Sequence, residues 1–309
     1  MVRRLIGVVV NRNAAGARRP GLAERLAALC GDDGAVRQTR TPGELASVLD
    51  EFAARGCDLV AMCGGDGTNL ATITAAVRSF GEGALPRFAL LRGGTVNTVA
   101  RNLGIGGTPE QILAALVRRR RAGTPVREVG QDLLDVEGRF GFLFAAGMGA
   151  RFLERYYAGP VLGVPWASVL AARTVLSSLV KGGFARSLFE PLPCTLVADG
   201  AELPIAEVRL LVASVVADVG IGMRVAWRAG QQPNRFHVVA SALPMRSMAL
   251  QLGRVIAGEA LAGGPHVDLL ARELEVRFTR PQSFTLDGEL FREERVRVRV
   301  GPRIWIEKP

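Results

Sequence analysis

Short, unbroken apolar runs alternate with segments of helical periodicity over residues 1–121. Leu5–Val10 and Leu59–Met62 contain no polar side chain and are typical of strands buried on both faces of a sheet. Residues 45–52 and 70–77 carry apolar side chains every three or four positions, which is the spacing of one helix face. This regular alternation predicts a doubly wound α/β domain with a mainly parallel sheet.

The pattern changes beyond residue 125, where strands are separated by tight turns. Glu137-Gly138, Asp199-Gly200 and Asp287-Gly288 each lie between apolar or alternating runs, as two-residue hairpin turns do. We therefore expect residues 1–124 to form the α/β domain. Residues 125–309 should form a mainly antiparallel β-sandwich, with the boundary near residues 122–126.

Three turns at the predicted strand ends are small or glycine-rich: Asn11–Gly16, Gly64–Thr68 and Gly93–Asn97. In a doubly wound sheet such turns converge on one crevice, where glycines let a ligand approach the backbone and helix N-termini attract phosphates. Nucleotide binding is the prediction. Asp66, inside the second turn, could serve Mg²⁺ through water or accept a proton. The alternative is that Asp66 only caps a helix.

Length and composition narrow the functional classes. The chain has 309 residues, enough for about two domains, and a formal charge of +10, which suits nucleic acid, an anionic membrane or a phosphorylated ligand. Aromatic residues make up only 6%, so no nucleic-acid partner is expected. Four cysteines without metal spacing and two histidines argue against zinc and favour a reducing, cytoplasmic location.

The apolar stretches are too short or too interrupted to cross a membrane. Leu5–Val10 is too short for a signal peptide, and the longest stretch, roughly residues 161–180, contains Pro165 and Arg173. Its helical part, about Pro165–Val180, could lie on a membrane or line an acyl pocket. Packing against the sandwich is the more ordinary alternative.

Several motifs together resemble the bacterial lipid kinases of the diacylglycerol kinase and sphingosine kinase group. They are Asn11, Gly64–Thr68, Gly94–Arg101 with Leu103-Gly104, Phe144–Gly149 and Asp287–Glu289. The resemblance covers nearly the whole chain. It implies a first domain related to those of phosphofructokinase and NAD kinase, a β-sandwich second domain, and an active site in the cleft between the domains.

The resemblance also implies roles for individual residues. Asp287 would be the general base on a lipid hydroxyl, with Glu289 beside it, while Asp66 is the alternative base and a tentative Mg²⁺ ligand through water. The residues implied to bind ATP are Asn11, Thr39, Gly64, Gly65, Asp66, Gly67, Thr68, Asn69, Gly94, Thr95 and Asn97. Arg92 and Arg101 flank the third turn and could offset phosphate charge.

Three departures from the family pattern are visible. Arg12 stands where proline usually follows Asn11, and Ala71 replaces a glutamate that often follows the second turn. Gln232, Pro233 and Asn234 occupy positions that often carry the acidic ligands of a structural magnesium. We therefore expect no such structural metal.

The sequence thus predicts an enzyme that uses ATP and Mg²⁺ to phosphorylate a lipid alcohol such as diacylglycerol or a sphingoid base. We expect it in the cytoplasm, with peripheral contact to an anionic membrane surface. One alternative is NAD kinase, although no Asn-Glu dipeptide follows Gly64–Thr68. Another is a nucleotide- or lipid-binding regulator without turnover. For Asp287 itself, the alternative is a plain hairpin turn.

Overall fold

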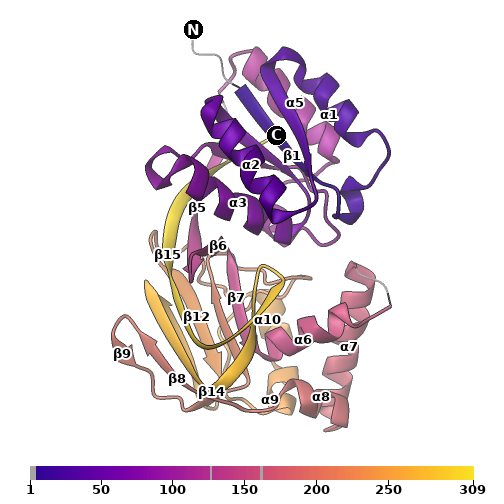
Figure 1. The fold of residues 1–309 in the computed structure, drawn as a ribbon. Coiled ribbons are helices and arrows are strands. Elements are labelled where there is room, and N and C mark those ends of the chain that lie inside the picture. The colour runs from indigo at the N-terminus through magenta and orange to yellow at the C-terminus, as the bar shows by residue number, and fades with distance from the viewer. Residues whose placement is uncertain (1–4, 126, 161–162) are drawn as a thin grey trace. The chain divides into compact units, whose positions relative to one another are not determined.

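The computed structural model describes residues 5–125, 127–160 and 163–309. The chain divides into two compact units (Figure 1). The first comprises Met1–Gln131 together with Pro302–Pro309, and the second comprises Asp132–Gly301. This division differs from the expected domains 1–124 and 125–309, because the last eight residues belong to the first unit. Residues 126, 161 and 162, which fall within the expected boundary and apolar stretch, lie outside the described residues.

The first unit is built from parallel strands with helices between them. Its strands are β1 (Leu5–Asn11), β2 (Gly34–Thr39), β3 (Cys57–Cys63) and β4 (Arg87–Leu90). Its helices are α1 (Leu22–Cys30), α2 (Pro42–Ala54), α3 (Asp66–Phe80), α4 (Thr98–Asn102) and α5 (Pro109–Arg121).

The strand order β4-β3-β1-β2 reverses direction at β1, as expected of a doubly wound sheet. With right-handed crossovers, α1 lies on one face of the sheet and α2 and α3 lie on the other. In agreement, α1 packs against α5, and α2 packs against α3 (Figure 1). The carboxyl ends of β1, β3 and β4 therefore lie next to one another at one edge.

Two helices of this unit begin at threonine caps. The Thr41 side chain accepts a hydrogen bond from the Glu44 N–H at the start of α2, and Thr108 and Gln111 form a reciprocal capping box at the start of α5. Each helix has proline in its first turn, where no intrahelical donor is lost.

The C-terminal end of the chain is held in the first unit by a strand pairing and a buried ion pair. Ile306 pairs with Phe88 of β4. Glu307, only 1% exposed, pairs with Arg120, whose guanidinium also contacts Asp58 of β3 at 2.9 Å. Breaking a buried pair by removing one partner typically costs about 3–5 kcal/mol. This contact explains why the domain boundary could not be read from local sequence.

The second unit is mainly antiparallel. Its strands are β5 (Arg127–Val136), β6 (Arg139–Gly141), β7 (Leu143–Gly147), β8 (Leu192–Ala198), β9 (Ala201–Glu202), β10 (Glu207–Val208), β11 (Leu210–Ser214), β12 (Phe236–Ser241), β13 (His266–Ala271), β14 (Glu273–Leu286) and β15 (Glu289–Lys308). Strands β5 and β15 extend into the first unit. Its helices are α6 (Met148–Tyr157), α7 (Val164–Leu179), α8 (Gly183–Leu188), α9 (Met245–Leu250) and α10 (Leu252–Ala257).

The strands run in the order β13-β12-β11-β7-β14-β15, and β8 also pairs with β14. All three predicted hairpins are present. In each, the acidic residue and the following glycine both have positive φ, as a two-residue type I′ turn requires. The fold class, an α/β first unit followed by a mainly antiparallel β unit, is confirmed.

Helices cover one face of this sheet. Apolar side chains of α8, α9 and α10 pack with Ala145, Leu210, Val212 and Val239 of the central strands. Helices α9 and α10 are joined at Gln251, whose side chain bonds both backbone groups of Ala262. None of the helices in the described ranges is long and apolar enough to cross a membrane.

Candidate active site

The three glycine-rich turns of the first unit meet at the carboxyl ends of β1, β3 and β4. The Asn11 amide donates from Nδ2 to Thr68 Oγ1 at 2.8 Å, which joins the first turn to the second. The Gly16 N–H donates to the Gly93 carbonyl at 2.9 Å, which joins the first turn to the third. The convergence predicted from the sequence is therefore present.

The second and third turns approach so closely that their glycines have no room for side chains. A Cβ at Gly94 would lie 2.2 Å from the Gly65 Cα, and one at Gly93 would lie 2.8 Å from the Gly64 nitrogen. A Cβ at Gly64 would lie 2.2 Å from Thr68 Oγ1. None of these three glycines has positive φ, so glycine is not needed here for its backbone conformation. It is needed because the chain segments lie too close together for a side chain. The result is a surface lined by main-chain groups.

Asp66 connects the second turn to α4. Its carboxylate accepts hydrogen bonds from the N–H groups of Thr98, at 2.8 Å, and Val99, at 3.2 Å. Burial raises the pKa of this carboxyl, although the two N–H groups and the charge of Arg101 oppose the rise. Asp66 thus supports the helix that follows the third turn, at a position where it could also face a bound cation.

Two side chains beside the turns retain unused polar atoms. Asn69, in the first turn of α3, is buried, and its Oδ1 has no hydrogen-bond partner among the described residues. Arg92 follows β4 with a φ of 52°, and its buried Nε is likewise without a partner in the described part of the chain. A buried orphan donor or acceptor costs about 1–3 kcal/mol, so a bound ligand that satisfies them would be favoured.

Three other residues predicted to contact the nucleotide differ in burial and in hydrogen bonding. The Asn97 amide closes its own turn, because it donates to the Gly94 carbonyl at 2.8 Å and accepts from the Gly94 N–H at 3.1 Å. Thr95 is exposed, whereas Thr39 is buried beside Asn11 at the end of β2. Asn97 therefore shapes the third turn, and Thr95 is the side chain that the turn presents to solvent.

Asp287 lies in the second unit, in the turn between β14 and β15. Its side chain is 7% exposed, and its carboxylate accepts hydrogen bonds from the N–H groups of Phe142, at 3.0 Å, and Leu143, at 2.9 Å. Its own N–H donates to the Leu143 carbonyl at 2.9 Å. The carboxylate is thus held firmly against the start of β7.

The same arrangement occurs a second time, at the hairpin of Asp199. That carboxylate accepts from the N–H groups of Arg272 and Glu273, at 2.8 and 2.9 Å, and the Asp199 N–H donates to the Glu273 carbonyl. Asp199 is exposed, whereas Asp287 is buried. Hydrogen bonding alone therefore does not mark Asp287 as catalytic, but Asp199 provides a control within the same chain.

Sequence patterns missed Tyr157, which supports the Asp287 hairpin. Its hydroxyl, at the end of α6, donates to the Gly288 carbonyl at 2.8 Å. The two residues are far apart in sequence, and no local pattern connects them. Glu289, the other predicted member of the acidic pair, is exposed at the first position of β15.

No group of three or more His, Cys, Asp or Glu side chains suited to a metal occurs within the described residues. Gln232, Pro233 and Asn234 stand where the family often has acidic ligands of a structural magnesium. In the structure the Asn234 N–H donates to the buried Asp132 carboxylate at 2.9 Å. One oxygen of the Asp132 carboxylate is therefore already hydrogen-bonded to a backbone N–H. Asp66 is the carboxylate nearest the glycine turns in sequence, and a nucleotide's own phosphates would have to supply most ligands of a bound Mg²⁺.

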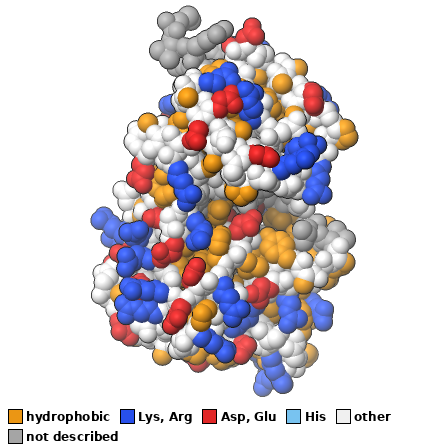
Figure 2. Space-filling view, in the orientation of Figure 1, with side chains coloured by type: hydrophobic (Ala, Val, Ile, Leu, Met, Phe, Trp, Pro, Cys, Tyr) orange, Lys and Arg blue, Asp and Glu red, His pale blue; other side chains and the backbone are white. Residues whose placement is uncertain are grey.

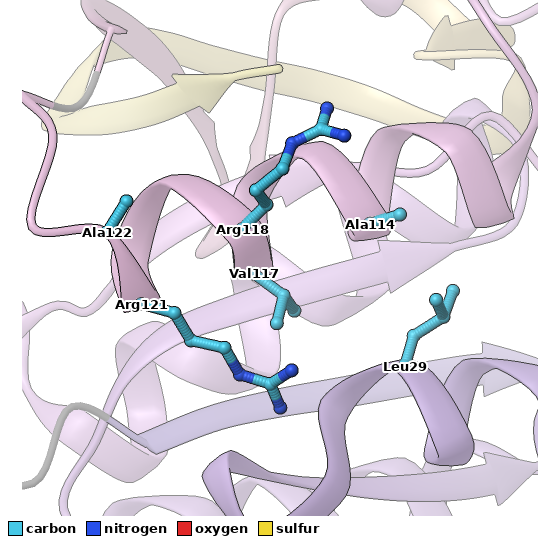
Figure 3. A pocket seen from close by; sticks show the side chains of 6 residues that line it. All are labelled: Leu29, Ala114, Val117, Arg118, Arg121 and Ala122. Atoms are coloured by element: carbon cyan, nitrogen blue, oxygen red, sulfur yellow. The ribbon is translucent and has the colours of Figure 1, made fainter.

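A shallow groove of the first unit lies apart from the turns (Figure 3). It is lined by Leu29, Ala114, Val117, Arg118, Arg121 and Ala122. Arg121 reaches across it toward α1, where it donates to the Cys30 carbonyl and pairs with Asp33. Because this guanidinium is already engaged, the groove is a weaker anion site than the glycine turns.

The fold and the turns define a protein with a doubly wound α/β unit and a mainly antiparallel β unit. Residues 6–128 match the family model described as the diacylglycerol kinase catalytic domain. The resemblance inferred from the motifs is thereby confirmed. No curated protein sequence is similar enough to match the chain.

Solved structures show the same fold over almost the whole chain. One is of a protein described as a diacylglycerol kinase from Bacillus anthracis str. Sterne, with a TM-score of 0.74 and 15% identity, and the match covers 99% of this chain and 97% of that one. A second diacylglycerol kinase structure from the same organism has a TM-score of 0.65 and 14% identity over the same shares. At such identity the likeness establishes the fold alone.

Proposed function

We propose that the protein is an ATP-dependent lipid kinase that transfers the γ-phosphoryl group to the hydroxyl of a lipid alcohol. The observation that carries the proposal is the convergence of three glycine-rich turns in a segment that matches the diacylglycerol kinase catalytic domain model. Phosphoryl transfer needs positioning and charge stabilisation more than covalent chemistry, and a backbone-lined surface supplies both.

In this proposal the first unit binds the nucleotide. The glycines at positions 64, 65 and 94 let the turns pack closely, so that main-chain groups are available to the phosphates, and Asn11, Thr68 and Asn69 supply side-chain contacts. Arg92 offsets phosphate charge through its unpaired Nε. Bound Mg²⁺ would neutralise charge on the phosphates, with Asp66 as its protein-side carboxylate, directly or through water.

The second unit supplies the base. Asp287 removes the proton from the acceptor hydroxyl, and Glu289 lies two residues further along the same hairpin. The N–H groups of Phe142 and Leu143 fix the orientation of the Asp287 carboxylate. A fixed orientation favours a general base, because the carboxylate does not have to reorganise during transfer.

The proposed acceptor also suggests where in the cell the enzyme acts. A lipid alcohol is presented at a membrane surface, so we infer a cytoplasmic enzyme in peripheral contact with an anionic bilayer. On the face in Figure 2, basic side chains are mixed with acidic ones over both units, so the +10 charge is not gathered there in one patch.

A labelled-ATP assay over a lipid panel in mixed micelles tests the proposal, with NAD as a competing acceptor. We expect Mg²⁺-dependent labelling of at least one of diacylglycerol, monoacylglycerol or a sphingoid base, and none of NAD. Labelling of NAD at a comparable rate would instead establish the NAD kinase alternative.

A regulator without turnover is a second candidate, because both catalytic carboxylates accept backbone hydrogen bonds. Such a protein would bind ATP and leave every lipid unlabelled. Calorimetric titration with ATP, run on the sample used in the assay, distinguishes a silent binder from an inactive preparation.

A further inference from the structure

The solvent-facing side of α7 is apolar, although an exposed helix face is normally polar. Val169, Leu176 and Val180 are 56%, 66% and 79% exposed, and with Arg173 they occupy positions 0, 4, 7 and 11 of one helical stripe. The opposite side is buried through Ala167, Leu170, Thr174 and Ser178. The helix therefore has two nonpolar sides, of which one is covered by the second unit.

Neighbouring helices also expose apolar side chains. Leu250, at the end of α9, is 70% exposed, and Ile256 of α10 is 54% exposed. Helix α7 packs against both α8 and α9, so these elements form one helical layer of the second unit. Single exposed apolar residues need no explanation, but several on packed helices mark an interaction surface.

The charges along this layer have one sign. Residues 155–189 and 241–258 contain no Asp or Glu, although both contain arginine or lysine. Lys181 is exposed directly after the stripe, and Arg173 lies on the stripe with its guanidinium 4.2 Å from the ring centre of Phe184. Glu190 and Glu259, each one residue beyond these segments, are exposed, and Glu259 pairs with Arg254 at 3.3 Å. Apolar side chains bordered mainly by cations complement an anionic lipid surface, where headgroups attract the cations and acyl chains accept the apolar groups.

We propose that the exposed stripe of α7, together with Leu250 and Ile256, is a docking surface for an anionic lipid bilayer. The choice of a bilayer over a protein rests on the proposed function and on the absence of acidic residues from both segments. A second copy of this face would bring like charges together, so self-association is disfavoured.

Hydrogen bonds connect this surface to the Asp287 hairpin through adjacent tyrosines of α6. The Tyr156 hydroxyl accepts from the Gly163 N–H at the start of α7, and the Tyr156 carbonyl accepts from Trp166 Nε1. Tyr157 donates to the Gly288 carbonyl. The docking helix and the hairpin of the proposed base are thus attached to neighbouring residues of one short helix.

The test is co-sedimentation of the full chain with vesicles, without ATP. Vesicles of phosphatidylcholine mixed with phosphatidylglycerol are compared with vesicles of phosphatidylcholine alone. We expect binding to the mixed vesicles that weakens as salt rises, since exposed charges are screened. The double variant Leu176→Asp, Val180→Asp should lower the partition coefficient more than about tenfold, and Lys181→Ala about fivefold at low salt.

Controls separate docking from folding and from turnover. Trp305→Ala removes an exposed apolar side chain of the first unit and should leave vesicle binding unchanged. Circular dichroism of the double variant should match the wild type, because both substituted side chains are largely exposed. Its turnover of a short-chain lipid in detergent micelles should also persist.

Unchanged vesicle binding by the double variant would overturn the docking surface while leaving the kinase proposal untouched. A wild-type dimer in solution that the double variant dissociates would overturn it as well, in favour of an interface between copies. If the wild type binds vesicles but labels no lipid in the ATP assay, the result would count against the kinase proposal alone.

Discussion

Two aspartates, one in each unit, have the same kind of hydrogen-bond environment but different chemistry around them. Asp66 follows a glycine turn in the first unit and accepts from the first N–H groups of α4. Asp287 lies in a hairpin of the second unit and accepts from the first residues of β7 and the residue before it. Each carboxylate connects its turn to a second element.

The two aspartates differ in how far local architecture alone accounts for their surroundings. For Asp287 the backbone hydrogen bonds recur at Asp199, so they are accounted for by hairpin architecture. The two residues differ in that Asp287 is buried, whereas Asp199 is exposed and pairs with Arg235 at 3.3 Å. For Asp66 the surrounding glycines, and the Asn69 Oδ1 that has no partner in the described ranges, point to a ligand. Hydrogen bonds to a carboxylate therefore do not by themselves separate a turn from a catalytic base.

The largest expected effect is on the rate of the Asp287→Asn variant. The amide keeps one oxygen that can accept both backbone hydrogen bonds now made by Oδ1, but it cannot take the acceptor proton. Removing a general base costs about 10²–10⁴-fold, so kcat should fall by that factor while ATP affinity changes little. Steady-state kinetics and calorimetric ATP titration measure the two quantities.

Asp199→Asn is the control, since it makes the same change in a hairpin with the same backbone hydrogen bonds, and the ion pair with Arg235 that it also removes is exposed. Its kcat should equal that of the wild type, and both variants should retain the wild-type circular dichroism spectrum. If Asp287→Asn keeps more than about a tenth of wild-type kcat, the hairpin explanation stands and the base must be sought at Asp66.

A smaller effect is expected when the backbone contact between the glycine turns is disturbed. In Gly94→Ala the new Cβ would lie 2.2 Å from the Gly65 Cα, so the two turns must separate. Overpacking of this kind costs about 1–3 kcal/mol, and we expect ATP affinity to fall at least tenfold. Calorimetry with a nonhydrolysable ATP analogue measures the loss.

Gly106→Ala, in the same unit, is the control, because its added Cβ meets nothing within 4 Å and its φ is not positive. It should bind ATP like the wild type. Gly65→Val is a useful third variant, since Gly65 has an ordinary φ of −97° and its Cβ would lie 3.2 Å from the Gly94 Cα. Normal ATP binding by Gly94→Ala would place the nucleotide away from these turns.

The smallest effect is expected on the stability of Asp66→Asn. The amide offers a single acceptor to the Thr98 and Val99 N–H groups, which now use different oxygens, but it also removes a partly buried charge. These two contributions oppose each other, so the free energy of unfolding at neutral pH should change by only about 1 kcal/mol.

The raised pKa of Asp66 also determines whether its contribution to stability rises or falls with pH. Burial raises the folded pKa of Asp66 above its unfolded value, which is near 4. The stability contributed by this group is therefore fully present below the unfolded pKa and is lost as pH rises through the folded one. Denaturant titrations across that range should show this decline in the wild type and a flatter profile in Asp66→Asn. Parallel profiles would contradict the raised pKa.

Much of the local structure follows from the sequence. The strand and helix alternation and the three acidic-glycine hairpins are present as predicted. Each depends on side-chain periodicity or on the φ preference of a few adjacent residues, and such information is local. The convergence of the glycine turns was also predictable, because it follows from the topology of a doubly wound sheet.

Long-range contacts decided the rest. The return of residues 302–309 to the first unit depends on the burial of Glu307 against Arg120, and the support of the Asp287 hairpin depends on Tyr157. The apolar side of α7 that stays exposed is likewise invisible in its periodicity, since both sides are nonpolar. Sequence pattern specifies which residues can be buried, whereas only the packing of distant segments determines which of them are.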